Sequence, residues 1–295
     1  MSSAGHADHA DYYVPEPSRW PITATIAIFT MFVGGATALN GHSIGPTILG
    51  AGFLLFVYML FGWFGAVIGE SESGKYNEQV DVSFRMGMGW FIFSEVMFFA
   101  AFFGALYYAR MYSVPWLGGE GAKVATNHFL WPQFAATWPL FNPPSNYGFS
   151  HFKETIGAWG VPFTNTLILL TSGATVTWAH WGLQKGNRGQ LILGLATTVA
   201  LGGTFVFLQT EEYGHAYHAL GLTLNSGIYG ATFFMLTGFH GFHVTMGTIM
   251  LAVILARSIK GHFTPKHHFA FEAVAWYWHF VDVVWIGLFI FVYWL

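Results

Sequence analysis

Seven long apolar stretches, separated by more polar connections, constrain the fold of this chain more than any other feature. They run over residues 20–39, 46–68, 84–109, 159–181, 191–209, 228–256 and 271–294. Each is long enough to cross a bilayer, because about 20 residues of helix span the hydrocarbon core. Strands of a membrane barrel would be shorter and would alternate apolar with polar residues. We therefore predict an all-α membrane protein with seven transmembrane helices.

The composition agrees with this class and argues against several others. Only 8% of the residues are charged and 54% are hydrophobic, whereas about a quarter are charged in an average soluble domain. The net charge is -3 and the basic residues form no run, so neither a nucleic-acid partner nor a polybasic lipid anchor is predicted. The absence of cysteine excludes disulfides and thiolate metal sites.

The distribution of basic residues predicts the orientation. Residues 1–19 form a polar tail without the features of a cleavable signal. With the N-terminus inside, eight of the eleven Lys and Arg residues face the inner side: Arg19, Lys75, Arg85, Lys185, Arg188, Arg257, Lys260 and Lys266. The other three lie in or beside a long external connection, 110–158, whose tryptophans suggest that it follows the membrane interface. We thus expect a cytoplasmic N-terminus and an external C-terminus.

Proline and glycine are expected to mark helix ends. Pro21 and Pro46 fall in first turns, where a missing amide hydrogen costs nothing. Gly69, Gly186 and Gly261 follow predicted spans and are candidate caps, with an inner loop over 69–83.

Titratable side chains inside the membrane are the first candidates for function, because they are costly there. Glu95 lies in the middle of the third span. It could relay protons, or it could be a neutral carboxyl hydrogen-bonded across a helix interface. The second interpretation is favoured because no other acid lies on that span.

Histidines suggest a rival, metal-binding interpretation. His240 and His243 share one helix face, as do His279 and Asp282 on the last span. Two such faces could ligate a haem or a metal, or could hold helices together by hydrogen bonds. Glu272 and His180 lie nearer the span ends. His267 and His268, which follow Lys266, are predicted to lie in a solvated loop.

A basic group at the inner end of the sixth span is a candidate lipid site. Its members Arg257, Lys260, His262 and Lys266 could bind lipid headgroups or could only reflect the positive-inside rule. Trp63 and Glu70, on the second span, would lie at the same depth.

Four segments carry a resemblance to a known family. Residues 271–285, FEAVAWYWHFVDVVW, resemble the last helix of cytochrome c oxidase subunit III almost letter for letter. Residues 237–244 (TGFHGFHV), 94–99 (SEVMFF) and 177–180 (TWAH) are similar to that family in the same order.

The resemblance implies a fold and a division of labour. It implies a two-helix bundle (20–68) and a five-helix bundle (84–295) separated by a lipid-filled cleft. It implies no metal and no cofactor in this chain, with haem a and copper in partner subunits. The intramembrane polar residues would then be structural: His240, His243, His279, Asp282 and Glu272.

The resemblance also assigns residue roles. Glu95 matches the family's buried carboxyl that carbodiimides modify. Residues that match lipid contacts are Trp63, Phe64, Glu70, Phe91, Arg257, Lys260 and His262. Where many relatives read Trp-Trp with an Asp two residues later, this sequence has Trp63-Phe64-Gly65-Ala66, so headgroup contacts there are expected to differ.

The function implied is that of a non-catalytic subunit of a proton-pumping cytochrome c oxidase, which reduces oxygen to water. It would contact subunit I, share the complex with subunit II, bind phospholipids and support proton uptake, with cytochrome c as electron donor. Inner-face groups such as Glu70, Glu72, His262 and His267 could gather protons. The long external connection favours a bacterial source, and thus the plasma membrane. Alternatives are subunit III of a quinol oxidase and an independent membrane transporter.

Overall fold

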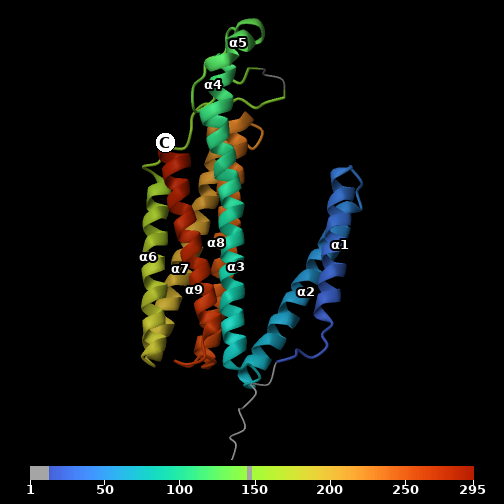
Figure 1. The fold of residues 1–295 in the computed structure, drawn as a ribbon, viewed down its shortest axis with the longest axis vertical. Coiled ribbons are helices and arrows are strands. Elements are labelled where there is room, and N and C mark those ends of the chain that lie inside the picture. The colour runs from blue at the N-terminus through green and yellow to red at the C-terminus, as the bar shows by residue number, and fades with distance from the viewer. Residues whose placement is uncertain (1–12, 145–147) are drawn as a thin grey trace, which may run out of the picture. The chain divides into compact units, whose positions relative to one another are not determined.

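The computed structural model describes residues 13–144 and 148–295, and all regular secondary structure within these ranges is helical (Figure 1). The chain divides into two compact units, Met1–Phe84 and Arg85–Leu295. Each unit is described by itself below.

The first unit is a helical hairpin of α1 (Trp20–Leu39) and α2 (Gly45–Glu72). Glycines let the two backbones touch. A Cβ at Gly34 would overlap the backbone of Leu49, and a Cβ at Gly45 would overlap the backbone of Ala38. Such close van der Waals packing stabilises helix association in a membrane, where lipid tails provide no hydrophobic driving force for it.

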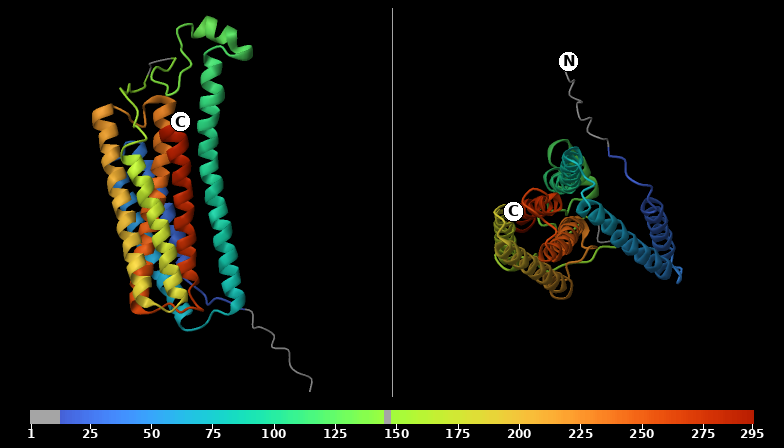
Figure 2. Two further views of the ribbon diagram at one scale, coloured as in Figure 1. Left: turned by 90° about the vertical axis from the view of Figure 1, so that its left-hand side faces the viewer. Right: turned by 90° about the horizontal axis from the view of Figure 1, so that it is seen from below.

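The second unit contains the remaining long helices. These are α3 (Glu78–Tyr108), whose first residues belong to the first unit, α6 (Val161–Gln184), α7 (Arg188–His215), α8 (Gly227–Lys260) and α9 (Phe269–Leu288). Helices α6 to α9 run side by side as a bundle, with α3 beside them (Figure 2). Three π-helical segments follow α3, α7 and α9: η1 (Ala109–Ser113), η3 (Ala216–Leu220) and η4 (Phe289–Trp294).

Two fully buried tryptophans of α9 organise the bundle core. The indole N–H of Trp278 donates to Ser172 Oγ at 2.9 Å, and that of Trp285 donates to Thr166 Oγ1 at 2.9 Å, both on α6. A Cβ at Gly202 or Gly247 would lie 2.8 Å from the Trp278 ring. Small residues on α7 and α8 therefore make the space that the largest side chain fills.

Helix α3 is attached differently, through long aromatic side chains. Phe98 packs edge-on against Phe239 of α8, with ring centroids 4.9 Å apart. Phe103 contacts Phe291 of η4 at 6.1 Å. By contrast, α6 and α7 approach so closely that a Cβ at Gly194 would lie 2.8 Å from that of Ala179.

The long connection between α3 and α6 is more structured than expected. It contains η1, α4 (Val114–Leu117), the short 3₁₀ turn η2 (Gly121–Lys123) and α5 (Val124–Leu130). Farther along, Phe152 stacks on Tyr229 of α8 at 5.4 Å, and Trp138 meets the same ring edge-on at 5.6 Å. This connection therefore covers the end of α8 as well as projecting from α3.

Six of the seven predicted spans are confirmed as helices long and apolar enough to cross a membrane. Among the described residues these are Trp20–Leu39, Gly45–Glu72, Glu78–Leu117, Arg188–Leu220, Gly227–Lys260 and Phe269–Trp294. The remaining predicted span, 159–181, forms α6, which is long enough but is not among the six. Asn165, Ser172 and several threonines make it more polar than the others.

The predicted positions of proline and glycine at helix ends are mostly correct. Pro21 and Pro46 lie in the first turns of α1 and α2. Gly186 and Gly261 have the left-handed φ values of 69° and 82° that a helix C-cap requires. The prediction for Gly69 is wrong: α2 continues to Glu72, so the connection to α3 is only residues 73–77.

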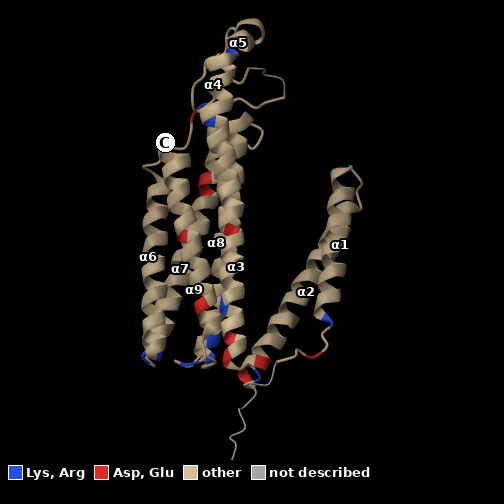
Figure 3. Cartoon of the chain, viewed as in Figure 1, with Lys and Arg blue, Asp and Glu red and all other residues tan. Residues whose placement is uncertain are grey.

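Charged residues gather near helix ends, and the helices are uncharged along most of their length (Figure 3). In the second unit, Lys185 follows the last residue of α6, Arg188 begins α7, and Arg257 and Lys260 lie in the last turn of α8. We call this end of the second unit the basic end.

Candidate functional site around Glu95 and the histidines

Glu95 and His243 form a hydrogen-bonded pair between α3 and α8. The Glu95 Oε2 lies 3.0 Å from His243 Nε2, and His243 Nδ1 lies 2.6 Å from the carbonyl oxygen of Phe239. A carbonyl only accepts, so Nδ1 carries a hydrogen. The contact with Glu95 then requires one more proton, on the carboxyl or on Nε2. The pair shares that proton and is neutral overall.

Aromatic rings enclose this pair. Tyr277 stacks on the His243 ring, with centroids 6.2 Å apart and planes 20° apart. Phe99 meets the same ring edge-on at 5.1 Å. The side chain of Glu95 is only 22% exposed and that of His243 only 9%. A neutral pair suits this apolar surrounding, because a lone buried charge would cost several kcal/mol.

The other intramembrane histidines make separate contacts. His240 Nε2 lies 3.3 Å from the carbonyl oxygen of Val281, to which it donates, and the ring of Trp285 lies 5.1 Å away. His279 Nε2 lies 3.2 Å from Thr177 Oγ1. His240, His243 and His279 therefore bond to three different partners and do not converge on a common ligand position.

Asp282 lies beside His279 at a close contact between α6 and α9. Its Oδ2 is 3.8 Å from His279 Nδ1, and the Asp282 side chain is buried. A Cβ on Gly173 would overlap Asp282 Oδ2. The glycine on α6 thus makes room for the carboxyl on α9.

Glu272 is the centre of a polar cluster at the basic end. Its Oε1 lies 3.3 Å from His268 Nε2 and 3.6 Å from His180 Nε2. Arg85, on α3, forms an ion pair with its Oε2. His267 is exposed, as predicted, but the prediction for His268 is wrong: this ring is buried at the start of α9, because it packs against His180. The spacing of four residues between His268 and Glu272, at a helix start, was the signal that could have revealed it.

A second polar cluster was not predicted from the sequence at all. Gln209 Nε2 donates to Glu212 Oε2 at 2.9 Å, and Tyr293 of η4 donates to the same oxygen at 2.9 Å. Asn165 of α6 completes the group, 3.5 Å from Gln209 Oε1. Glu212 lies three residues past the predicted span 191–209, so the apolar pattern did not include it, and it is only 5% exposed.

Among the candidate lipid residues of the first unit, Glu70 is tied to tyrosines. Its Oε2 accepts from Tyr76 at 2.7 Å and from Tyr13 at 3.2 Å. Burial and the neighbouring Glu70 carboxylate raise the pKa of Tyr76, so its hydroxyl donates at neutral pH. A hydrogen bond from Lys75 lowers the pKa of Glu16. Residues 13–16 are thereby held at the end of α2.

The remaining lipid candidates are partly exposed in their own units. Trp63 and Phe64 of α2 stack at 6.2 Å and are 48% and 59% exposed. In the second unit, Phe91 stacks on Tyr277 at 6.3 Å. The Arg257 guanidinium lies 4.5 Å from the centroid of Phe263. Lys260 ends α8 and is exposed, and His262 follows it.

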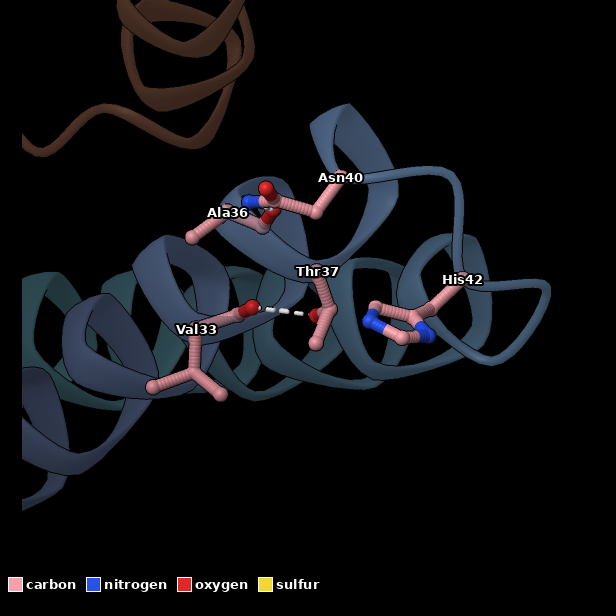
Figure 4. Close-up of a pocket in the computed structure, with 5 residues that line it drawn as sticks. All are labelled: Val33, Ala36, Thr37, Asn40 and His42. Atoms are coloured by element: carbon pink, nitrogen blue, oxygen red, sulfur yellow. Dashed lines mark hydrogen bonds between the residues drawn. The ribbon is translucent and has the colours of Figure 1, made fainter.

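A shallow depression of the first unit does not resemble a ligand site. Val33, Ala36, Thr37, Asn40 and His42 line it (Figure 4). The Thr37 hydroxyl donates to the Val33 carbonyl, and the Asn40 amide donates to the Ala36 carbonyl at 2.8 Å. These polar groups are used within the helix, so they do not converge on a ligand.

Comparison with known proteins identifies the family. The family model "Cytochrome c oxidase subunit III" matches residues 9–142 and 129–295. The chain belongs to the cytochrome c oxidase subunit III family. It is 41% identical over 290 residues to cytochrome c oxidase subunit 3 of Oncorhynchus clarkii and 42% identical over 290 residues to that of Gadus morhua, covering 98% of each chain. It is also 41% identical over 283 residues to that of Prototheca wickerhamii, covering 96% of each chain.

Family membership fixes the general assignment. The protein is a multi-pass membrane subunit of the cytochrome c oxidase complex, and subunit III has no redox centre of its own. The two matched segments overlap over residues 129–142, within the connection between α3 and α6. The four segments that carried the resemblance meet in two contacts: Glu95 bonds to His243, and Thr177 Oγ1 lies beside His279.

Proposed function

We propose that this chain is a non-catalytic subunit that stabilises the catalytic subunit I of a proton-pumping cytochrome c oxidase, in a complex that also holds subunit II and receives electrons from cytochrome c. Its likeness to subunit III over nearly the whole chain carries the proposal. Large apolar side chains on α1, α2 and α3 support it. Phe32, Phe61 and Trp90 are 75%, 78% and 66% exposed and need lipid or protein around them.

The membrane arrangement proposed is seven spans in a two-helix bundle and a five-helix bundle, with a lipid-filled cleft between them. We propose α6 as the remaining span, because it packs against α7 and α9 and its Ser172 and Thr166 hydroxyls accept hydrogen bonds from the indoles of Trp278 and Trp285. The gathering of Lys and Arg at the basic end supports a cytoplasmic N-terminus. The membrane is proposed to be a bacterial plasma membrane.

Phospholipid binding is proposed on both units. Arg257 and Lys260 end α8 with two positive charges suited to a phosphate headgroup. Trp63, Phe64 and Phe91 offer exposed rings suited to acyl chains. Lipid that stays with the purified complex should decrease in an Arg257→Gln, Lys260→Gln double variant, measured by native mass spectrometry. An unchanged lipid count would contradict this assignment.

Support of proton uptake is proposed for the exposed titratable groups of the basic end and of the end of α2. Glu72 and His267 are exposed and are placed to exchange protons with water. A Glu72→Gln, His267→Gln variant should slow proton uptake at alkaline pH, where free protons are scarce. The proposal fails if uptake is the same as in the unmodified complex at every pH.

The assignment is tested on the purified complex. Haem a and copper should copurify with this chain, and turnover should be faster with reduced cytochrome c than with quinol. Preparations depleted of this chain should keep both metals and the first turnovers but lose activity faster. Faster oxidation of quinol would replace the proposal by a quinol oxidase, and solute transport by the isolated chain in liposomes would replace it by a transporter.

A further inference from the structure

Three ligand atoms converge at the basic end of the bundle. The Nε2 atoms of His180 and His268 lie 3.4 Å apart. Glu272 Oε1 lies 3.3 Å from His268 Nε2 and 3.6 Å from His180 Nε2. Zinc binds nitrogen and oxygen at about 2.0–2.2 Å, so two ligands of a tetrahedral site lie roughly 3.4 Å apart. The three separations match one face of such a tetrahedron. Within the described residues, this is the one group of three His, Asp or Glu side chains so close together.

Hydrogen bonds to neighbouring groups leave lone pairs on these three atoms. His268 Nδ1 lies 3.0 Å from the carbonyl oxygen of Thr264, so it carries a hydrogen, and in the neutral ring Nε2 then keeps its lone pair. The amide nitrogen of Gln184 lies 3.4 Å from His180 Nε2, which therefore accepts. Arg85 pairs with Glu272 Oε2, leaving Oε1 to face the two rings. Three acceptors facing one another at these distances require a positive charge between them.

The surroundings are those of a metal site rather than of a random contact. The carbonyl of Thr264 fixes the His268 tautomer and ring, as outer partners of metal-bound histidines do. The site joins α6 to α9, and Arg85 adds α3. The side chain of His180 is 23% exposed and that of Arg85 is 35% exposed, so an ion can enter from water.

We propose that His180, His268 and Glu272 form a reversible binding site for a zinc-class divalent cation, with the fourth position open to water or to a residue of another subunit. Two imidazole nitrogens favour zinc over magnesium or calcium, which take oxygen ligands. The bound ion links α6 to α9 and displaces the Gln184 amide from His180.

The test measures zinc on the intact purified oxidase. Zinc per haem is counted after equilibrium dialysis against a zinc buffer, so that sites elsewhere in the complex contribute equally to every sample. The His180→Gln and His268→Gln variants should each bind one zinc fewer. Loss of a residue that only supports a ligand weakens metal binding by up to roughly a hundredfold, so loss of a ligand itself should weaken it by more than that. His267→Gln, one residue from the site, should retain the full count. Equal counts in all four proteins would overturn the proposal.

A measurement on the unmodified complex keeps the proposal testable if a variant does not assemble. One equivalent of zinc should protect His180 from a histidine-modifying acylating reagent, as mapped by mass spectrometry, and should leave His267 as reactive as before. Equal modification of His180 with and without zinc would show that the cluster holds only a proton, as an imidazolium of His268 paired with Glu272.

Discussion

Glu95 and His243 illustrate how a costly side chain becomes tolerable inside a membrane. The carboxyl alone would be a buried charge, but with His243 Nδ1 committed to the Phe239 carbonyl the two groups need only one shared proton. The sequence placed both residues inside the membrane. It could not reveal that they are partners, because the contact joins residues 148 positions apart and depends on how α3 rests on α8.

Replacing Glu95 distinguishes a protonated carboxyl beside a neutral imidazole from a carboxylate beside an imidazolium. In Glu95→Gln the amide can donate to His243 Nε2, so we expect stability close to that of the unmodified chain. In Glu95→Ala the buried imidazole loses its partner, which should cost about 1–3 kcal/mol. The stability of both variants is measured as the fraction of this chain that stays bound to the purified complex after heating. Equal destabilisation by the two substitutions would show that His243 is held as an imidazolium by a carboxylate.

The tie between the N-terminal segment and α2 gives a second residue-scale prediction. Tyr13→Phe removes the hydroxyl that donates to Glu70 but keeps the ring, which meets Tyr76 edge-on at 5.5 Å. Loss of one hydrogen bond of about 1 kcal/mol should speed amide exchange in residues 13–19 about fivefold. Tyr58→Phe, in the same unit, is the control. Identical exchange in both variants would mean that the bond does not hold the segment.

At the scale of the helices, the prediction succeeded wherever the apolar pattern was continuous. The first predicted span coincides with α1, and the others lie within a few residues of the observed helices. The ends were less predictable, because α2 continues past its apolar region to Glu72 and α3 begins before its apolar region, at Glu78. The helical part of the 110–158 connection was missed because its pieces are short and are stabilised by packing rather than by pattern.

The glycines between α1 and α2 give a prediction with a control on the adjacent residue. Gly34→Ala should destabilise the hairpin by about 1–3 kcal/mol, since its Cβ would meet the backbone of Leu49, which cannot move aside. At Gly35, one position along, nothing lies within 4 Å of the added Cβ. Gly35→Ala should therefore be neutral or slightly stabilising. Thermal unfolding in detergent measures the difference, and equal melting temperatures would contradict the close packing.

At the scale of the whole chain, the large cluster of buried apolar side chains belongs to the second unit. Its members run from Phe99 to Tyr293, and none comes from α1 or α2. A variant that begins at Asn77 should therefore keep hydrogen-exchange protection in α9 around Trp278 close to that of the full chain. Because two spans are removed together, the orientation of α3 is unchanged. Faster exchange in α9 would show that the core depends on the hairpin.

The π-helical segments affect how residues can be counted along this chain. Each of α3, α7 and α9 passes into a segment with one more residue per hydrogen-bonded ring than an α-helix. A helical wheel extended through them misassigns faces by about one residue, roughly 100°. Tyr293 lies in η4 and still reaches Glu212 of α7. Deleting a single residue from η4 would rotate that tyrosine away from Glu212, so the bundle end depends on chain length as well as on side-chain identity.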